Sequence, residues 1–193
     1  MSEIATETRT IPEIIKDLTK AMVLFPKDVE LHEESLFGTG YHMRLRVNAA
    51  DAGKIIGSRG DHINALKTLI IKMGAAQGTP VRLTLLEPTV GKKRKPQDFV
   101  NDPDVNVEPL AVLTGELLTT MGYGGLVGAS PNVYKNVMTE VADGDVTATV
   151  LIRKTSEMDD SKEWGDVLAS LKKVIIAAGR QRGRSVELDF VDV

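Results

Sequence analysis

Cysteine is absent from this sequence of 193 residues, and aromatic residues make up only 4% of it. Without cysteine the chain has no disulfide, no thiolate chemistry and no cysteine-based metal site. Long apolar runs are missing as well, so no segment approaches the length that crosses a membrane. The formal net charge is -3, so the chain also lacks an overall positive charge. Any affinity for a polyanion must therefore come from a local patch of cations.

Signatures of catalysis are also missing. The sequence has no phosphate-loop motif, no dinucleotide-binding fingerprint and no serine-nucleophile motif. Its 3 histidines lack the spacing of metal ligands. We therefore expect a protein that is not an enzyme and that holds neither a metal nor a cofactor. The N-terminus shows no basic segment followed by an apolar one, which favours a cytoplasmic protein.

What remains is typical of a globular protein, with 42% hydrophobic and 26% charged residues. The length suits one large domain or two small ones. Over residues 11–88, hydrophobic periodicity predicts the order helix, strand, strand, helix, helix, strand. The first helix is expected to begin at Thr10 or Ile11, with Pro12 in its first turn, and to end before Pro26. The expected strands are Val29 to Glu34, Tyr41 to Val47 and Val81 to Leu86, with a turn at Phe37 to Gly40.

The most informative stretch is a glycine turn between the second and third predicted helices. Ile55 and Ile56 lead into Gly57-Ser58-Arg59-Gly60, and Ile63 begins the apolar face of the next helix. The two glycines allow a backbone conformation that a Cβ would block. The first N–H groups of the next helix have no partner within it, so they favour an anion. Arg59 adds a cation suited to phosphate. Such a turn is often only a turn, but its helical flanks here predict a phosphate site.

Residues Ile56 to Ile63 match, position for position, the Ile-Gly-x-x-Gly-x-x-Ile signature of KH domains, and the stretch resembles that loop. The order of elements resembles the type II, bacterial form, and residues 11–88 look especially like the small single-domain KH proteins of bacteria. The resemblance implies an α+β fold, with three strands backed by three helices, that binds single-stranded RNA. In that family the loop clamps about four nucleotides. The RNA-binding residues that the resemblance implies are Lys54, Ile55, Ile56, Gly57, Ser58, Arg59, Gly60 and Ile63.

A mechanism follows from the resemblance. The amides of Ser58 to Asp61 and the Arg59 side chain would hold the sugar-phosphate backbone, and bases would enter a groove floored by the three isoleucines. The far wall of that groove would come from the strand that carries Arg44 and Arg46, or from Arg82; both strand arginines equally suit a solvated sheet face. His62 is expected at a surface helix position. We expect Asp61 to cap the helix start, where its charge slightly opposes a phosphate. The affinity of one domain should then be weak, on the order of micromolar.

The second half reads as a repeat of the first. A shift of 105 positions places Leu66 on Leu171, Ile70 on Ile175 and Leu45 on Val150. Farther upstream, Pro12 pairs best with Pro109. We therefore expect two tandem type II KH-like domains. The expected boundaries are a flexible leader at 1–10, a first domain at 11–88, a basic and proline-containing linker at 89–106, and a second domain at 107–193.

The repeat departs from the family at the turn. Gly57-Ser58-Arg59-Gly60 corresponds to Lys162-Glu163-Trp164-Gly165, which retains one glycine. Asp159, Asp160 and Glu163 would repel a phosphate. We infer that the second copy has lost the usual binding site and serves as a spacer, as a surface for a protein partner or self-association, or as a binder through another face. Trp164 either packs on its neighbours or stacks on a base.

Two clusters of cations are candidates for auxiliary RNA contacts. The predicted linker contains Lys92, Lys93, Arg94 and Lys95, and the turn before the last strand contains Arg180, Arg182 and Arg184, with Lys172 and Lys173 on the preceding helix. Each cluster is either a solvated connector or a track for phosphates.

The leading hypothesis is a cytoplasmic protein that binds single-stranded RNA. The alternative is a structural or adaptor protein that uses KH-like folds for protein–protein contacts in a ribonucleoprotein or assembly. A third hypothesis is a preference for single-stranded DNA, because the loop alone does not require a 2′-hydroxyl. A bacterial or phage origin fits the pattern.

Overall fold

A computed structural model describes residues 9–35, 40–89, 108–123, 137–142, 145–153, 158, 161–181 and 185–191. Its elements follow the order predicted for the first half and then repeat most of that order. The helices are α1 (Ile11–Met22), α2 (Ala49–Ile56), α3 (Asp61–Ala76), α4 (Glu108–Thr120) and α5 (Lys162–Gln181), and two 3₁₀ turns are η1 (Pro26–Asp28) and η2 (Ser58–Gly60). The strands are β1 (Glu30–Ser35), β2 (Tyr41–Arg46), β3 (Val81–Leu85), β4 (Val137–Ala142), β5 (Asp145–Arg153) and β6 (Ser185–Val191).

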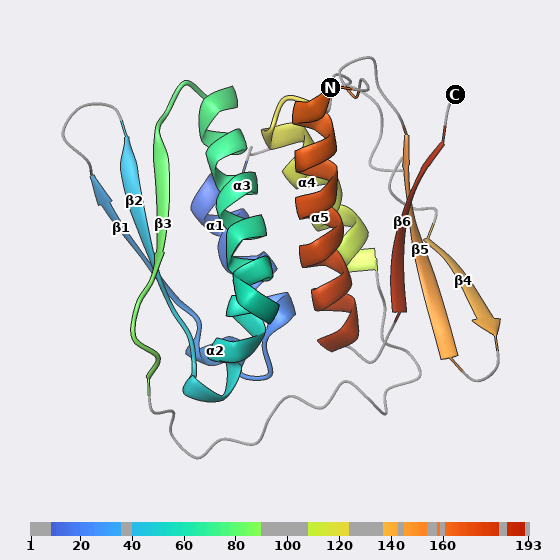
Figure 1. Cartoon of the computed structure of the whole chain (residues 1–193), viewed down its shortest axis with the longest axis horizontal. Helices are drawn as coiled ribbons and strands as arrows, with labels where there is room; N and C mark the ends of the chain where they lie inside the picture. Colours follow the sequence, from blue (N-terminus) through green and yellow to red (C-terminus); the bar gives the residue numbers. More distant parts are fainter. Residues whose placement is uncertain are drawn as a thin grey trace, which may run out of the picture.

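Two three-stranded sheets lie on either side of a layer of helices (Figure 1). In the first sheet, β1 is antiparallel to β2 and β2 is parallel to β3. The second sheet has the same plan, with β4 antiparallel to β5 and β5 parallel to β6. Helices α1, α2 and α3 lie on the side of the first sheet, whereas α4 and α5 lie on the side of the second (Figure 1). The α+β class and the element order predicted for residues 11–88 are therefore confirmed.

Helix α1 begins where the sequence places it, at the N-cap Thr10. The Thr10 N–H and hydroxyl both donate to Oε2 of Glu13, at 2.8 and 2.9 Å, and Pro12 occupies the first turn. This capping box satisfies donors that the helix start leaves open. The backbone hydrogen bond from Thr10 also lowers the pKa of Glu13 below its usual value. The helix ends at Met22, earlier than predicted, and Pro26 instead opens η1.

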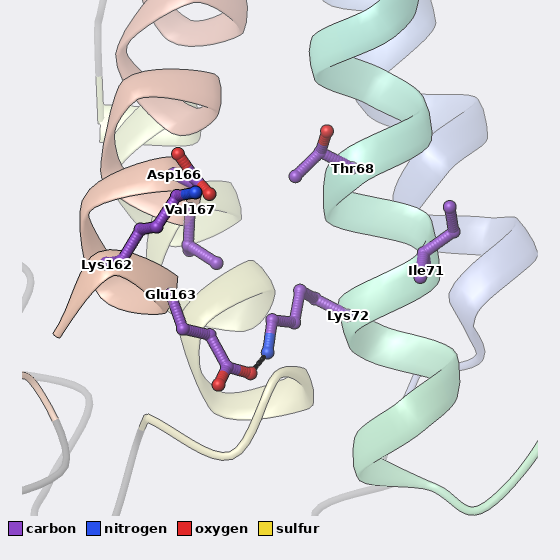
Figure 2. A pocket seen from close by; sticks show the side chains of 7 residues that line it. All are labelled: Thr68, Ile71, Lys72, Lys162, Glu163, Asp166 and Val167. Carbon is purple, nitrogen blue, oxygen red and sulfur yellow. Dashed lines mark ion pairs between the residues drawn. The ribbon is translucent and has the colours of Figure 1, made fainter.

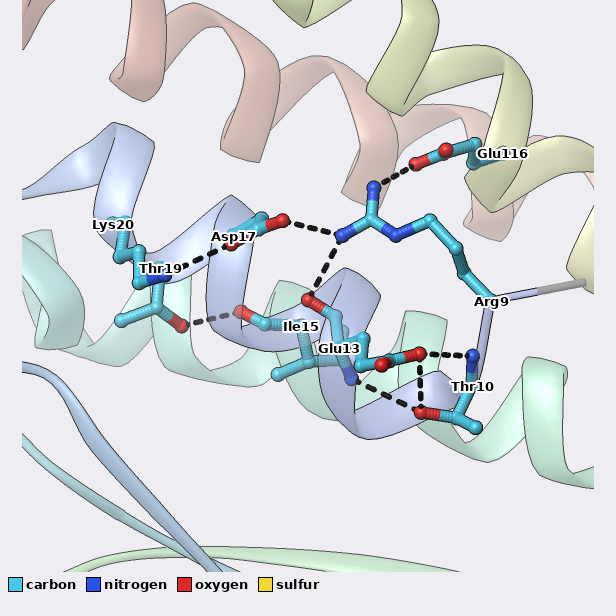
Figure 3. Close-up of polar contacts among 8 residues, drawn as sticks. All are labelled: Arg9, Thr10, Glu13, Ile15, Asp17, Thr19, Lys20 and Glu116. Atoms are coloured by element: carbon cyan, nitrogen blue, oxygen red, sulfur yellow. Dashed lines mark hydrogen bonds and ion pairs between the residues drawn. The ribbon is translucent and has the colours of Figure 1, made fainter. Parts of the chain in front are cut away.

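Arg9 ties the start of α1 to the second half of the chain. Its guanidinium pairs with Asp17 of α1 and, at 2.7 Å, with Glu116 of α4 (Figure 3). Residues 1–10 are predicted to be a flexible leader, yet Arg9 and Thr10 are held by hydrogen bonds and ion pairs. Residues 1–8 lie outside the described part of the chain.

The core is one continuous apolar cluster that draws on both halves. It contains fully buried side chains from α1 and α3, such as Ile15 and Leu66, together with Leu117 of α4 and Leu171 of α5. The apolar face of each helix therefore points inward, toward the helices of the other half as well as toward its own sheet.

Helices α3 and α5 lie side by side and run antiparallel (Figure 1). Lys72, near the end of α3, forms an ion pair with Glu163 at the start of α5. At the other end of α3, Nζ of Lys173 lies 3.4 Å from Oδ1 of Asp61. Because the pair is antiparallel, the C-terminal half of α5 lies at the end of the layer where α3 begins.

Equivalent positions in the two halves have equivalent burial. Leu45 and Val150 are both buried, and so are Ile70 and Ile175. The two sheets differ in register, since Leu45 pairs with Leu85 whereas Val150 pairs with Leu188. This is a slip of two residues relative to the sequence alignment. A slip of two keeps every side chain on its original face of the sheet.

The largest difference between the halves lies just before the long helix of each sheet. Positions 162–165, which align with the glycine turn, form the first turn of α5 instead of a loop. In the first half the corresponding residues separate α2 from α3. The helical conformation at 162–165 agrees with the loss of the glycine turn inferred from the sequence.

Some predicted features are shifted or fall outside the described residues. Strand β1 begins one residue later than expected, at Glu30, and β2 and β3 each end one residue earlier. Most of the turn expected at Phe37 to Gly40 lies outside the described residues. Among the described residues, no helix is both long and apolar enough to cross a membrane.

A shared core predicts that the two halves unfold together. Trp164, the only tryptophan, packs in the second half with its ring centroid 4.8 Å from that of Tyr123. Leu66→Ala removes a fully buried side chain from the first half, which should cost about 2–5 kcal/mol of unfolding free energy. Urea unfolding followed by tryptophan fluorescence and by far-UV circular dichroism should give coincident curves, both shifted to lower urea.

The neighbouring exposed position supplies the control, since Lys67→Ala should leave both curves within about 0.5 kcal/mol of wild type. A fluorescence transition that stays in place while the circular dichroism splits into two steps would show that the halves have separate cores.

Candidate nucleic-acid interface

The turn between α2 and α3 adopts a backbone conformation that requires its glycines. Gly57 has φ 74° and ψ 178°, a combination reached almost only by glycine. A Cβ at Gly57 would lie 2.6 Å from the ring of His62. Gly60 is left-handed at φ 84°, and Arg59 shares that region at φ 54°. The Gly-x-x-Gly pattern is thus needed both for the backbone path and for the close approach of α3.

A buried carboxylate holds α2 in place beneath this turn. Asp51 is fully buried and accepts hydrogen bonds from the backbone N–H groups of Leu24 and Phe25, at 2.9 and 2.8 Å. Lys54 adds an ammonium group 3.3 Å from the same carboxylate. Backbone donors and a cation together satisfy a charge that would otherwise be costly to bury. Asp51 therefore fixes α2 against the segment that follows α1.

His62 locks the two helices on either side of the turn. Its Nδ1 lies 2.7 Å from the carbonyl oxygen of Lys54, and its ring covers Gly57. His62 is predicted at a surface position, whereas the structure places it partly buried, with its ring against Gly57. Its place immediately after the turn is the one sequence signal that points to this role.

Two amides of the turn are available to a ligand. The Gly60 N–H donates to the carbonyl oxygen of Gly57 at 3.3 Å, and the Asp61 N–H donates to that of Ser58. The N–H groups of Ser58 and Arg59 have no acceptor among the described residues. This narrows the set of four amides predicted from the sequence to two. Both residues are exposed, and Arg59 has no acidic partner in the described part of the chain.

The three isoleucines around the turn have different environments. Ile55 is fully buried in the core, so its side chain supports the turn from inside. Ile56 is 40% exposed, and Ile63 packs at the edge of the core. Lys54 keeps about a third of its side chain exposed beside them, at 35%. Ile56 and Ile63 are thus the apolar side chains that a ligand at the turn can reach.

Asp61 does not cap α3, which corrects the sequence-based expectation. The N-cap is Gly60, and no side chain caps this helix start. Since Gly60 takes the left-handed conformation that closes the turn, Asp61 is already the first helical residue. Its carboxylate lies beside Lys173 of α5 instead.

The strand arginines have acidic partners on the adjacent strand. Arg44 pairs with Glu34 at 2.8 Å, and Arg46 lies 3.4 Å from Glu30. These pairs agree with the alternative that both arginines lie on a solvated sheet face. Arg82 is exposed on β3.

Of the arginines and lysines predicted in the linker and in the turn before the last strand, the structure describes Arg180. Arg180 is exposed in the last turn of α5. Six others, Lys92, Lys93, Arg94, Lys95, Arg182 and Arg184, lie outside the described residues.

Trp164 packs inside the protein. It retains 8% of its surface and contacts Tyr123 at the end of α4. The hypothesis that this ring stacks on a base is therefore wrong, because its faces are covered by the protein.

A groove that the sequence does not reveal lies between α3 and α5. Its volume is about 460 Å³, and Figure 2 shows the side chains of Lys72 and Glu163 meeting across it. Lys72 and Glu163 close one end with an ion pair. The lining residues are Thr68, Ile71, Lys72, Lys162, Glu163, Asp166 and Val167. The groove lies toward the end of α3 that is farther from the glycine turn. The described residues contain no cluster of three or more histidine or acidic side chains suited to a metal ion.

Comparison with known proteins matches the first half of the chain. A family model described as "KhpA/KhpB, KH domain" matches residues 12–85. The RNA-binding protein KhpA of Listeria monocytogenes is 31% identical over 75 residues, which cover 39% of this chain and 97% of the relative. RNA-binding protein KhpA of Halalkalibacterium halodurans is 30% identical over 74 residues, or 38% and 96% of the two chains. Through the domain that carries the glycine turn, this chain belongs to the KhpA/KhpB family of KH domains.

Proposed function

We propose that this protein binds single-stranded RNA and that the turn at Gly57 to Gly60 holds the phosphate backbone. The observation that carries the proposal is a pair of backbone N–H groups without a described acceptor, those of the exposed residues Ser58 and Arg59, in the turn that precedes α3. They lie in a domain whose relatives are named RNA-binding proteins.

A phosphate at this turn gains from three sources. The N–H groups of Ser58 and Arg59 donate to its oxygens, and the positive end of the α3 dipole favours its charge. The Arg59 guanidinium, which has no described acidic partner, adds a charge-assisted fork of donors. Ser58 and Arg59 are both exposed, so the sugar-phosphate chain can approach their amides. Lys54 lies one turn away on α2 and adds a partly exposed cation.

Bases that leave the backbone at this turn meet a small apolar surface. Ile56 and Ile63 form it, and Ile55 supports it from the core. Such a surface receives bases of any identity, so sequence preference must come from a few hydrogen bonds to base edges. We therefore assign weak preference and micromolar affinity, on the order of 1 μM, to one domain acting alone.

We further propose that residues 107–193 are a second KH-like domain, after a leader at 1–10, a first domain at 11–88 and a linker at 89–106. The shared strand order, the matched burial of Leu45 with Val150 and the aligned prolines support this reading. Because its counterpart of the glycine turn is helical, the second domain lacks the loop that presents the amides of Ser58 and Arg59 in the first domain. It backs the first domain through the shared core rather than binding RNA at a turn of its own.

An adaptor role, in which both folds contact proteins, is the alternative function. The helical turn at 162–165 favours it for the second domain, and the exposed amides of Ser58 and Arg59 disfavour it for the first. Single-stranded DNA is the alternative ligand. We propose a cytoplasmic, non-catalytic role in either case. Binding assays with RNA and DNA oligonucleotides of the same sequence distinguish RNA binding, DNA binding and an adaptor role.

Reversing the charge at the turn should abolish binding. Ser58→Asp with Arg59→Asp places two carboxylates where the phosphate is proposed to lie. We expect affinity for a labelled mixed-sequence RNA, measured by fluorescence anisotropy at moderate salt, to fall more than about tenfold. Both side chains are exposed, so the fold should survive, which circular dichroism checks.

A matched control is available at the end of α3 that is far from the glycine turn, beside the start of α5. Ser161→Asp with Lys162→Asp makes the same kind of change at two exposed residues where α5 begins. Aspartate suits that helix start, so the variant should fold and bind RNA as wild type does. Equal binding by the turn variant and wild type would remove the turn from the mechanism. No binding of either nucleic acid by wild type would favour the adaptor role.

The glycine requirement gives a second test. Gly57→Ala puts a Cβ against the His62 ring in a conformation that alanine avoids, so it should cost about 1–3 kcal/mol of unfolding free energy and most of the RNA affinity. Gly53→Ala is the control: it lies within α2 with open space around it, and should stabilise the protein by about 0.5–1 kcal/mol. Urea unfolding and RNA titration check both variants. A Gly57→Ala protein that binds RNA normally would contradict the assigned role of the turn.

A further inference from the structure

The second half of the chain places a cation beside the RNA-binding turn of the first. Lys173 of α5 lies with its Nζ 3.4 Å from Oδ1 of Asp61, the residue that follows the glycine turn. Both side chains remain about half exposed, at 49% and 56%. The contact therefore lies on the surface, where an RNA strand that leaves the glycine turn can reach it.

Asp61 is an unfavourable neighbour for a phosphate. Its carboxylate is one residue from the turn and, without a partner, would repel RNA at the point where the amides attract it. Within the first half, the described residues give Asp61 no cation of its own. Lys173, from a helix more than a hundred residues later in the chain, compensates this charge.

Arg180 continues the same face of α5 beyond Asp61. It follows Lys173 by seven residues, close to two helical turns, so both project from the same side of the helix about 10 Å apart along its axis. Because α5 is antiparallel to α3, the segment of α5 from Lys173 to Arg180 extends past the start of α3, toward the end of the helix layer that holds α2 (Figure 1). Arg180 is exposed, so its guanidinium is open to a ligand.

We propose that α5 completes the RNA site of the first domain. Lys173 neutralises Asp61 beside the turn, and Arg180 extends the track of phosphate contacts past it. The inference rests on the proposed function, since the ligand is the same single-stranded RNA held by the turn. It gives the second half a part in binding even though its own turn is lost.

The sequence alone does not distinguish Lys173 from its neighbour Lys172. Both are exposed, but one residue is about 100° around a helix, so Lys172 projects from a different side of α5. The structure assigns the role to Lys173 because it is the one that contacts α3.

Charge removal on the full chain tests the composite site. Lys173→Gln with Arg180→Gln should weaken binding of a labelled 12-nucleotide RNA about tenfold and reduce the slope of log affinity against log salt by about 1. The control, Lys162→Gln with Lys172→Gln, removes the same charge from the same helix and should change affinity less than about twofold. Equal losses in the two variants would show a general charge effect and overturn the proposal.

Neutralisation of Asp61 is tested by rescue. Lys173→Ala leaves the carboxylate unpaired and should weaken RNA binding, and adding Asp61→Asn should restore most of the loss. A loss that Asp61→Asn does not repair would contradict the neutralising role. A merely structural role of Lys173 would appear as a lower urea midpoint without this rescue of affinity.

The outcomes separate this inference from the proposed function. If wild type binds RNA and Ser58→Asp with Arg59→Asp abolishes binding, the turn is the site, whatever α5 does. Normal binding by Lys173→Gln with Arg180→Gln would then overturn the composite site alone. If the turn variant binds normally, the proposed function itself fails.

Discussion

The packing of α3 against α5 is the contact on which the rest of the structure depends. Each sheet has helices on one side, and the two sets of helices cover one another (Figure 1). Leu66 and Leu171, which align in the two halves, are both fully buried in the resulting cluster. A three-stranded sheet with two or three helices buries little apolar surface by itself, so sharing one core stabilises both halves. The same contact sets the direction of α5 and therefore decides which of its side chains approach the glycine turn.

Much of the first half could be predicted from the sequence because its signals are local. Alternating apolar residues mark β2 and β3, Thr10 and Pro12 mark the start of α1, and the glycine pattern marks the turn. The details that depend on contacts between distant residues could not be predicted. Asp61 looks like a helix cap in the sequence, but Gly60 takes that position and Asp61 turns to Lys173.

Burial was the other property that sequence pattern could not settle around the turn. Ile55 and Ile56 are adjacent and chemically identical, yet Ile55 is fully buried and Ile56 is 40% exposed. Trp164 resembles a residue that could stack on a base until its packing against Tyr123 is seen. The position of His62 just after the turn is its one sequence signal, and its contact could not be predicted because it depends on the carbonyl of Lys54 lying 2.7 Å away in the fold.

The antiparallel arrangement also places the two aligned turn positions at opposite ends of the helix layer. The glycine turn lies at one end of α3, and the aligned residues 162–165 lie beside the other end of that helix, about 24 Å away for a helix of 16 residues. An intact second turn would therefore lie a full helix length from the first rather than extend it. Because residues 162–165 are helical, the described residues present a glycine turn at one end of the layer, and the other end is closed by the first turn of α5.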